Sequence, residues 1–152
     1  MKLQDQAKSV RQKLSNLSQK QGISYQYIAT SFLLERLVAR IVSDNNLYKS
    51  IVFKGGYVAL RIYESRRYTI DLDALLSKSY LKETLKQVRK AAEKDIGDAV
   101  WFRFEKEIDL KTQGEYGGIR QVFRAGIGEI SKNIKRSQVI HSLDCFSYNF
   151  VT

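Results

Sequence analysis

The chain has 152 residues and 43% hydrophobic content, contains no proline and shows no Ser/Gly-rich linker, so residues 1–152 are predicted to form a single domain with its own core. The formal net charge of +10 favours nucleic acids and nucleotides as partners, although many basic domains bind no polyanion and charge alone assigns no function. The single cysteine, Cys145, excludes an intrachain disulfide and a multi-cysteine zinc site, and the lack of a signal peptide or of about 18 consecutive apolar residues predicts a cytoplasmic protein without membrane contact.

Two helices are predicted in the N-terminal part of the chain. Residues 2–20 carry apolar side chains at helical spacing, and Gly22 is well placed to end this helix. Ser24 is placed to cap a second helix, which residues 44–46 (Asp-Asn-Asn) are expected to end. The second helix has one apolar stripe with the i, i+3, i+4, i+7 pattern: Leu34, Leu37, Val38 and Ile41.

A strand, a glycine turn, a helix and a second strand are predicted in the middle of the chain. Residues 50–54 indicate a short strand, 56–64 a helix and 68–75 another strand. Gly55 and Gly56 lie at the junction of the first strand and the helix, where free backbone N–H groups can hold a phosphate. This junction is therefore a candidate nucleotide contact.

Asp71 and Asp73 lie two residues apart in the second of these strands. Because strand side chains alternate between faces, both carboxylates are expected on one face, side by side. Two unpaired carboxylates repel each other, and a hard cation such as Mg²⁺ between them removes that repulsion. The spacing therefore predicts a metal site.

The remainder of the chain is predicted to form a helix and then strands without further helices. The helix after the break at residues 77–79 has a basic side, which is either plainly solvated or holds phosphates: Lys82, Lys86, Arg89, Lys90 and Lys94. Residues 100–110 and 119–127 indicate a hairpin around a Gly-containing loop, and 137–146 a last strand. This order predicts an α+β fold with a mixed sheet and helices packed on it, rather than a doubly wound sheet.

Two stretches, residues 52–63 and 67–75, resemble the AbiEii/AbiGii-type abortive-infection toxins of the nucleotidyltransferase superfamily. In that superfamily an apolar residue and a glycine pair precede a helix, and two carboxylates follow on the next strand. The glycine pair and the Asp-x-Asp are each weak signals alone. Here one helix joins them, and Lys54 and Arg67 flank them as in the family. The resemblance implies a nucleotidyltransferase-like fold.

The resemblance also implies an activity and its partners. Asp71 and Asp73 would bind two Mg²⁺ ions, which orient a nucleoside triphosphate (NTP) and activate an acceptor hydroxyl. The residues implied at the nucleotide are Lys54, Gly55, Gly56 and Arg67. For Arg67, surface solvation or an ion pair with Asp71 is an equal alternative. Family members of known activity are toxins, some adding nucleotides to the 3′ end of transfer RNA, so RNA is the implied acceptor and a cognate antitoxin the implied partner.

A third carboxylate on a later strand usually completes such a site and serves as general base. Asp144 is the candidate, because residues 139–144 look like the family's late strand that ends in aspartate. Asp109 is the rival, since it lies in an equally apolar stretch. Either residue can instead be an ordinary strand-end or turn aspartate.

The chain departs from the family in two ways. Tyr57 follows the glycine pair, where many relatives have a Ser or Thr that hydrogen-bonds a phosphate. Relatives usually continue into a C-terminal helical region, so we expect a domain that is truncated relative to the family. The resulting alternative is a catalytically silent relative that acts only as a nucleic-acid- or antitoxin-binding module. A third reading is a pure RNA-binding protein.

Overall fold

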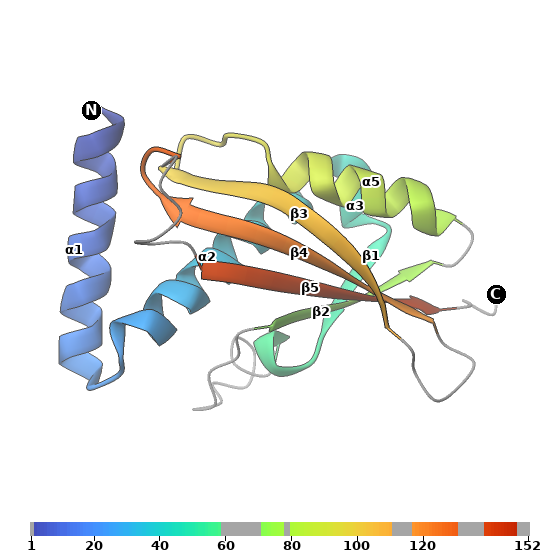
Figure 1. Ribbon diagram of the computed structural model, residues 1–152, viewed down its shortest axis with the longest axis horizontal. Helices are drawn as coiled ribbons and strands as arrows, with labels where there is room; N and C mark the ends of the chain where they lie inside the picture. Colours follow the sequence, from blue (N-terminus) through green and yellow to red (C-terminus); the bar gives the residue numbers. More distant parts are fainter. Residues whose placement is uncertain (1, 59–70, 78–79, 111–116, 131–138, 149–152) are drawn as a thin grey trace.

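The computed structural model describes residues 2–58, 71–77, 80–110, 117–130 and 139–148, and within them it shows a five-stranded mixed sheet with helices packed on it (Figure 1). The strand order is β1-β2-β5-β4-β3. The strands are β1 (Ile51–Lys54), β2 (Asp71–Ser77), β3 (Val100–Leu110), β4 (Gly118–Ile127) and β5 (Val139–Tyr148). Strands β2 and β5 run parallel, and the other neighbours are antiparallel. The predicted α+β class and mixed sheet are confirmed.

The helices begin and end largely where local signals place them. Their bounds are α1 (Leu3–Gln21), α2 (Tyr25–Ser43), α3 (Asn45–Tyr48) and α5 (Leu81–Ala92). Gly22 ends α1 in the left-handed conformation at φ 66°, and the Ser24 side chain accepts a hydrogen bond from the N–H of Tyr27 at the start of α2. Among these described helices, none combines the length and apolar character needed to cross a membrane.

The short helix α3 was not expected from the sequence. Residues 44–46 were predicted only as a helix end, and α2 does end at Ser43. The Asp44 carboxylate then accepts hydrogen bonds from the N–H groups of Asn46 and Leu47, which starts α3 immediately. Asp44 is therefore both the C-cap of α2 and the N-cap of α3.

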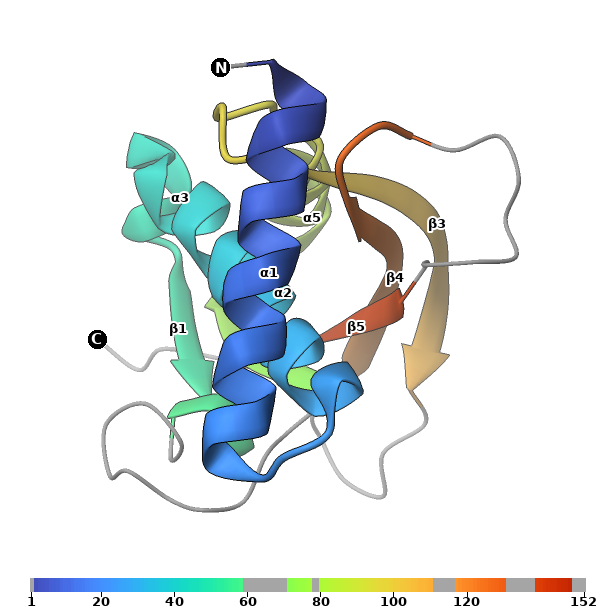
Figure 2. The same ribbon diagram turned by 90° about the vertical axis from the view of Figure 1, so that its left-hand side faces the viewer.

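The core lies between the helices and one face of the sheet. In α2 the predicted stripe is buried, with Leu34, Leu37 and Ile41 fully enclosed. Figures 1 and 2 show the helices gathered on the same side of strands β3 to β5. Leu72 and Leu76 of β2 are also fully enclosed, whereas the residues alternating with them are only partly buried. The sheet therefore has a helix-covered face and a second face.

The predicted elements of the middle region lie only partly within the described residues. Residues 56–58 are helical and residues 59–64 of the predicted helix lie outside them, as do residues 68–70 of the predicted strand. The predicted hairpin of β3 and β4 is confirmed, with a bulge between Phe104 and Lys106.

A buried ion pair ties α2 to the connection between α5 and β3. The Arg40 side chain, 0% exposed, donates to both carboxylate oxygens of Asp98 at 2.9 and 2.8 Å. It also donates to the backbone carbonyls of Arg36, Lys94 and Val100. Burial acts to raise the pKa of Asp98, but hydrogen bonds from Arg40 and Arg36 outweigh it, and the pKa is lowered. Each side-chain nitrogen of Arg40 and each carboxylate oxygen of Asp98 therefore has a hydrogen-bond partner.

Candidate functional site

Asp71 and Asp73, hereafter the acid pair, lie on the second face of the sheet. They alternate in β2 with Leu72, Ala74 and Leu76, which are fully enclosed on the helix-covered face. Both aspartates are partly buried. The predicted same-face arrangement of the two carboxylates is confirmed.

Gly55 forms a bend against which the Asp73 carboxylate rests. Strand β1 pairs with β2 so that Lys54 is opposite Asp73, and Gly55 follows at φ 80°. A Cβ atom on Gly55 would lie 3.3 Å from Cγ of Asp73 and would collide with its Oδ2. Only glycine combines that backbone conformation with that approach. The carboxylate of Asp73 therefore points toward the glycine bend.

Asp144 lies directly beside the acid pair. Strand β5 is parallel to β2, with Asp144 opposite Asp73. Its chain neighbours Leu143 and Cys145 are buried in the core on the helix-covered face, so Asp144 shares the second face with the acid pair. Burial raises the pKa of the Cys145 thiol to about 12, which leaves that thiol protonated and unreactive.

Asp109 does not reach this site. It lies on β3, separated from β2 by β4 and β5, which amounts to about 14 Å at the usual strand spacing. Its cross-strand partner Ile119 packs against the core, so Asp109 belongs to the helix-covered face and is exposed beyond the helices. Of the two predicted third carboxylates, the structure brings only Asp144 to the acid pair.

Arg120 is a site residue that the sequence analysis missed. Strand β4 pairs with β5 so that Arg120 is opposite Asp144. Its Nε donates to Oδ1 at 2.8 Å and its Nη2 to Oδ2 at 2.9 Å, which forms a two-pronged ion pair. The available signal was an arginine in a largely apolar strand that also carries Gln121 and Arg124, and only the register identifies the partner of Arg120.

Negative charge is concentrated at this point of the sheet. Burial, followed by the charge of Asp144, raises the pKa of Asp71, and Arg120 opposes the shift. The pKa of Asp73 is raised by the same two causes and by Asp71, while Lys54 and Arg120 oppose it. The ionised forms of Asp71 and Asp73 are therefore disfavoured, and a bound cation would stabilise them.

The acid pair fits a divalent cation better than the set of three carboxylates does. Over the described part of the chain, no group of three or more His, Cys, Asp or Glu side chains is arranged to hold a metal ion. Mg²⁺ often takes only one or two carboxylates and completes its shell with water and substrate phosphates. Asp71, Asp73 and the glycine cradle offer such a partial set.

The other predicted nucleotide contacts divide between this site and the undescribed residues. Lys54, Gly55 and Gly56 form the turn beside Asp73. Arg67 lies outside the described residues. Tyr57 is buried in the core cluster, so its side chain packs in the core.

The basic side of α5 lies away from the acid pair. Helix α5 packs on the helix-covered face, where Leu85 and Val88 are enclosed and Arg89 stacks 4.4 Å from the Phe104 ring centroid. Lys82, Lys86 and Lys90 are exposed. Of the two readings of this basic side, the geometry favours solvation.

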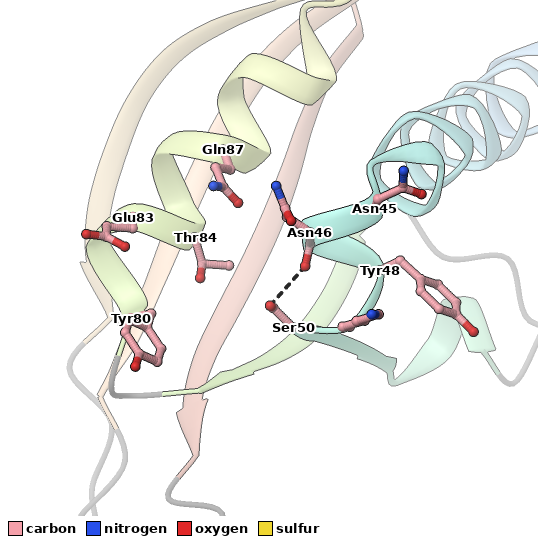
Figure 3. Close-up of a pocket in the computed structure, with 9 residues that line it drawn as sticks. Asn45, Asn46, Tyr48, Ser50, Tyr80, Glu83, Thr84 and Gln87 are labelled. Atoms are coloured by element: carbon pink, nitrogen blue, oxygen red, sulfur yellow. Dashed lines mark hydrogen bonds between the residues drawn. The ribbon is translucent and has the colours of Figure 1, made fainter.

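A groove of about 710 Å³ lies between α3 and α5 (Figure 3), and none of the three aspartates lines it. It is lined by Asn45, Asn46, Tyr48, Lys49, Ser50, Tyr80, Glu83, Thr84 and Gln87. Figure 3 shows the Ser50 hydroxyl bonded to the carbonyl of Asn46, so part of this polar lining is satisfied internally. With one lysine and one carboxylate, the groove is a weaker candidate for phosphate chemistry than the acid pair.

Comparison with models of known families places the chain in one of them. No match is found among curated proteins. Residues 36–140 match the family described as nucleotidyl transferase AbiEii toxin of the type IV toxin–antitoxin system. The matched range contains Gly55, the acid pair and Arg120, and it ends before Asp144. Because it covers most of the 152 residues and includes the glycine bend and the acid pair, the chain belongs to the AbiEii family of nucleotidyl transferase toxins.

Proposed function

We propose that this protein is a metal-dependent toxin that transfers a nucleotide from an NTP to an RNA acceptor, with transfer RNA as the first acceptor to test. The observation that carries the proposal is the Asp73 carboxylate, which rests against the Gly55 bend beside Asp71. Nucleotidyl transfer requires a backbone that a phosphate can approach and a pair of carboxylates at the same place. The net charge of +10 supports a polyanionic acceptor, and membership of a toxin–antitoxin family supports an antitoxin partner.

Each residue of the site has a distinct proposed role. Asp71 and Asp73 hold Mg²⁺, which when bound neutralises charge on the triphosphate. Gly55 and Gly56 let the backbone approach the phosphates, and Lys54, opposite Asp73, adds a positive charge. Asp144, the third carboxylate, has an electrostatic role, because Arg120 already donates to both of its oxygens.

Nucleotide incorporation into total transfer RNA tests the proposal. Each of the four α-labelled NTPs is supplied in turn with Mg²⁺, to wild type and to the Asp71→Asn/Asp73→Asn double variant. Metal stabilisation of several kcal/mol predicts a loss of incorporation on the order of 10²–10³-fold in the double variant. Asp109→Asn is the matched control, since it removes a carboxylate from β3 on the other face, and it should retain full activity. Equal incorporation by wild type and the double variant would contradict the proposal.

The alternative, a catalytically silent binding module, has one observation in its favour. Arg120 holds both oxygens of Asp144, so the third carboxylate is already paired. This alternative predicts no incorporation by wild type, and RNA binding that weakens steeply with salt and is unchanged in the Asp71→Asn/Asp73→Asn variant. Filter binding at several salt concentrations distinguishes it from the enzyme.

A further inference from the structure

Asp144 forms an ion pair with the guanidinium of Arg120. The Arg120 guanidinium matches it in a fork, with one N–H on each oxygen at 2.8 and 2.9 Å. The Asp144 side chain is only 9% exposed, so little of the carboxylate remains open to a second partner. A metal ion on these oxygens would also lie within a few ångströms of the guanidinium, where like charges repel strongly.

The charge of Arg120 acts on the whole site. It lowers the pKa of Asp71 and of Asp73, against the effects of burial and of Asp144. Together with Lys54, which acts on Asp73, it places two cations beside the three carboxylates within the part of the chain that the structure describes. Three carboxylates and two cations sum to a charge of −1, so one divalent ion already reverses the sign, and a second would add two further positive charges before any phosphate binds.

We propose that Arg120 is the built-in cation of Asp144, so that the protein binds one divalent ion at the acid pair and none at Asp144. Arg120 is thus a positioning residue that occupies the place of a second metal ion. The acid-pair ion rests on the proposed function, whereas the assignment of Arg120 to Asp144 rests on the ion pair alone. The two parts can therefore fail separately.

The number of Mn²⁺ ions bound per chain tests the proposal. Bound Mn²⁺ is obtained by equilibrium dialysis with electron paramagnetic resonance of the free ion, without nucleotide. We expect one Mn²⁺ for wild type and two for Arg120→Met, because the freed Asp144 gains a metal. Arg124→Met is the matched control and should stay at one, since Arg124 lies on the same strand and face but pairs with Glu105.

The counts separate the two parts of the inference. Two ions in wild type, or one in both wild type and Arg120→Met, overturn the role of Arg120 while leaving the acid-pair site intact. No ion in wild type but one in Arg120→Met supports the role of Arg120 and overturns the acid-pair site. No ion in either protein overturns both.

Stability gives a second readout, because Arg120→Met leaves a buried carboxylate without its cation. Thermal unfolding is followed in EDTA and in Mn²⁺. Mn²⁺ should raise the Tm of Arg120→Met by about 3 °C or more beyond its effect on wild type. The double variant Arg120→Met/Asp144→Asn removes both charges and should respond to Mn²⁺ as wild type does. Equal Mn²⁺ effects on wild type and Arg120→Met would overturn the proposal.

Discussion

Within the residues that the structure describes, two forked Arg–Asp pairs have nearly identical bond lengths and different surroundings. Arg40 and Asp98 lie on the helix-covered side, with the arginine side chain 0% and the aspartate 14% exposed. Arg120 and Asp144 lie on the second face, with the arginine 37% and the aspartate 9% exposed. In the first pair the arginine is the buried partner, and in the second it is the aspartate.

The neighbours of the two pairs explain what each can do. Arg40 also donates to backbone carbonyls, and hydrogen bonds from Arg40 and Arg36 lower the pKa of Asp98 against the effect of burial. Beside Asp144 lies the acid pair, whose two pKa values are raised. One pair is a closed structural link, whereas the other belongs to a site that still favours a cation.

Breaking the structural pair should have the largest effect on stability. Asp98→Ala leaves the buried Arg40 charge unpaired, and we expect the free energy of unfolding to fall by about 3–5 kcal/mol. Urea denaturation followed by circular dichroism measures it. Glu105→Ala is the comparison, since it breaks a more exposed Arg–Glu pair and should change stability by about 1 kcal/mol or less. Similar losses in both variants would show that burial does not separate these pairs.

Gly55→Ala should disturb the site as well as the fold. Alanine at φ 80° is strained, and its Cβ collides with the Asp73 carboxylate. We expect a stability loss of about 1–3 kcal/mol and Mn²⁺ binding weakened about tenfold or more. Isothermal titration calorimetry measures the affinity.

Gly22→Ala is the matched control for Gly55→Ala. Gly22 has a similar φ of 66°, but a Cβ there meets nothing within 4 Å. The strain without the collision should lower stability by about 1 kcal/mol and leave Mn²⁺ affinity unchanged. If both variants lose the same Mn²⁺ affinity, the cradle at Gly55 has no specific role.

The parts of the fold that depend on neighbouring residues could be predicted from the sequence. Gly22 and Ser24 act within one turn of their helix ends, and the stripe of α2 follows from helical periodicity. The spacing of Asp71 and Asp73 fixes their common face for the same reason. The start of α3 escaped prediction because Asp44 ends one helix and caps another, and the two signals overlap.

The rest of the site depends on the strand order, which no local pattern encodes. Strand β5 inserts between β2 and β4, and this places Asp144 beside Asp73 while β3 with Asp109 lies at the edge. Asp109 and Asp144 have similar local contexts, so the sequence left both open. The same insertion sets Arg120 opposite Asp144 across 24 residues of chain.

The smallest expected effect, of opposite sign, concerns the charge of the acid pair. The folded-state pKa values of Asp71 and Asp73 are raised above the ordinary aspartate value of 3.8, so ionisation at neutral pH opposes folding. The Asp71→Asn/Asp73→Asn variant should therefore be more stable than wild type at pH 7 in EDTA, by about 0.5 kcal/mol for these partly exposed groups. Urea denaturation at a series of pH values measures this difference.

The gain should disappear as the pH falls toward 3.8 and below, because wild type is then protonated at both positions in the folded state. Asp98→Asn should behave in the opposite way: its pKa is lowered, so the stability that wild type gains from this carboxylate exists above 3.8 and declines as the pH falls through the folded-state value. Mn²⁺ at pH 7 should reverse the order for the acid pair, since it stabilises only the protein that retains both carboxylates. A double variant that is less stable than wild type in EDTA at pH 7 would mean that the acid pair is a structural element like Arg40 and Asp98, and not a strained site that awaits a cation.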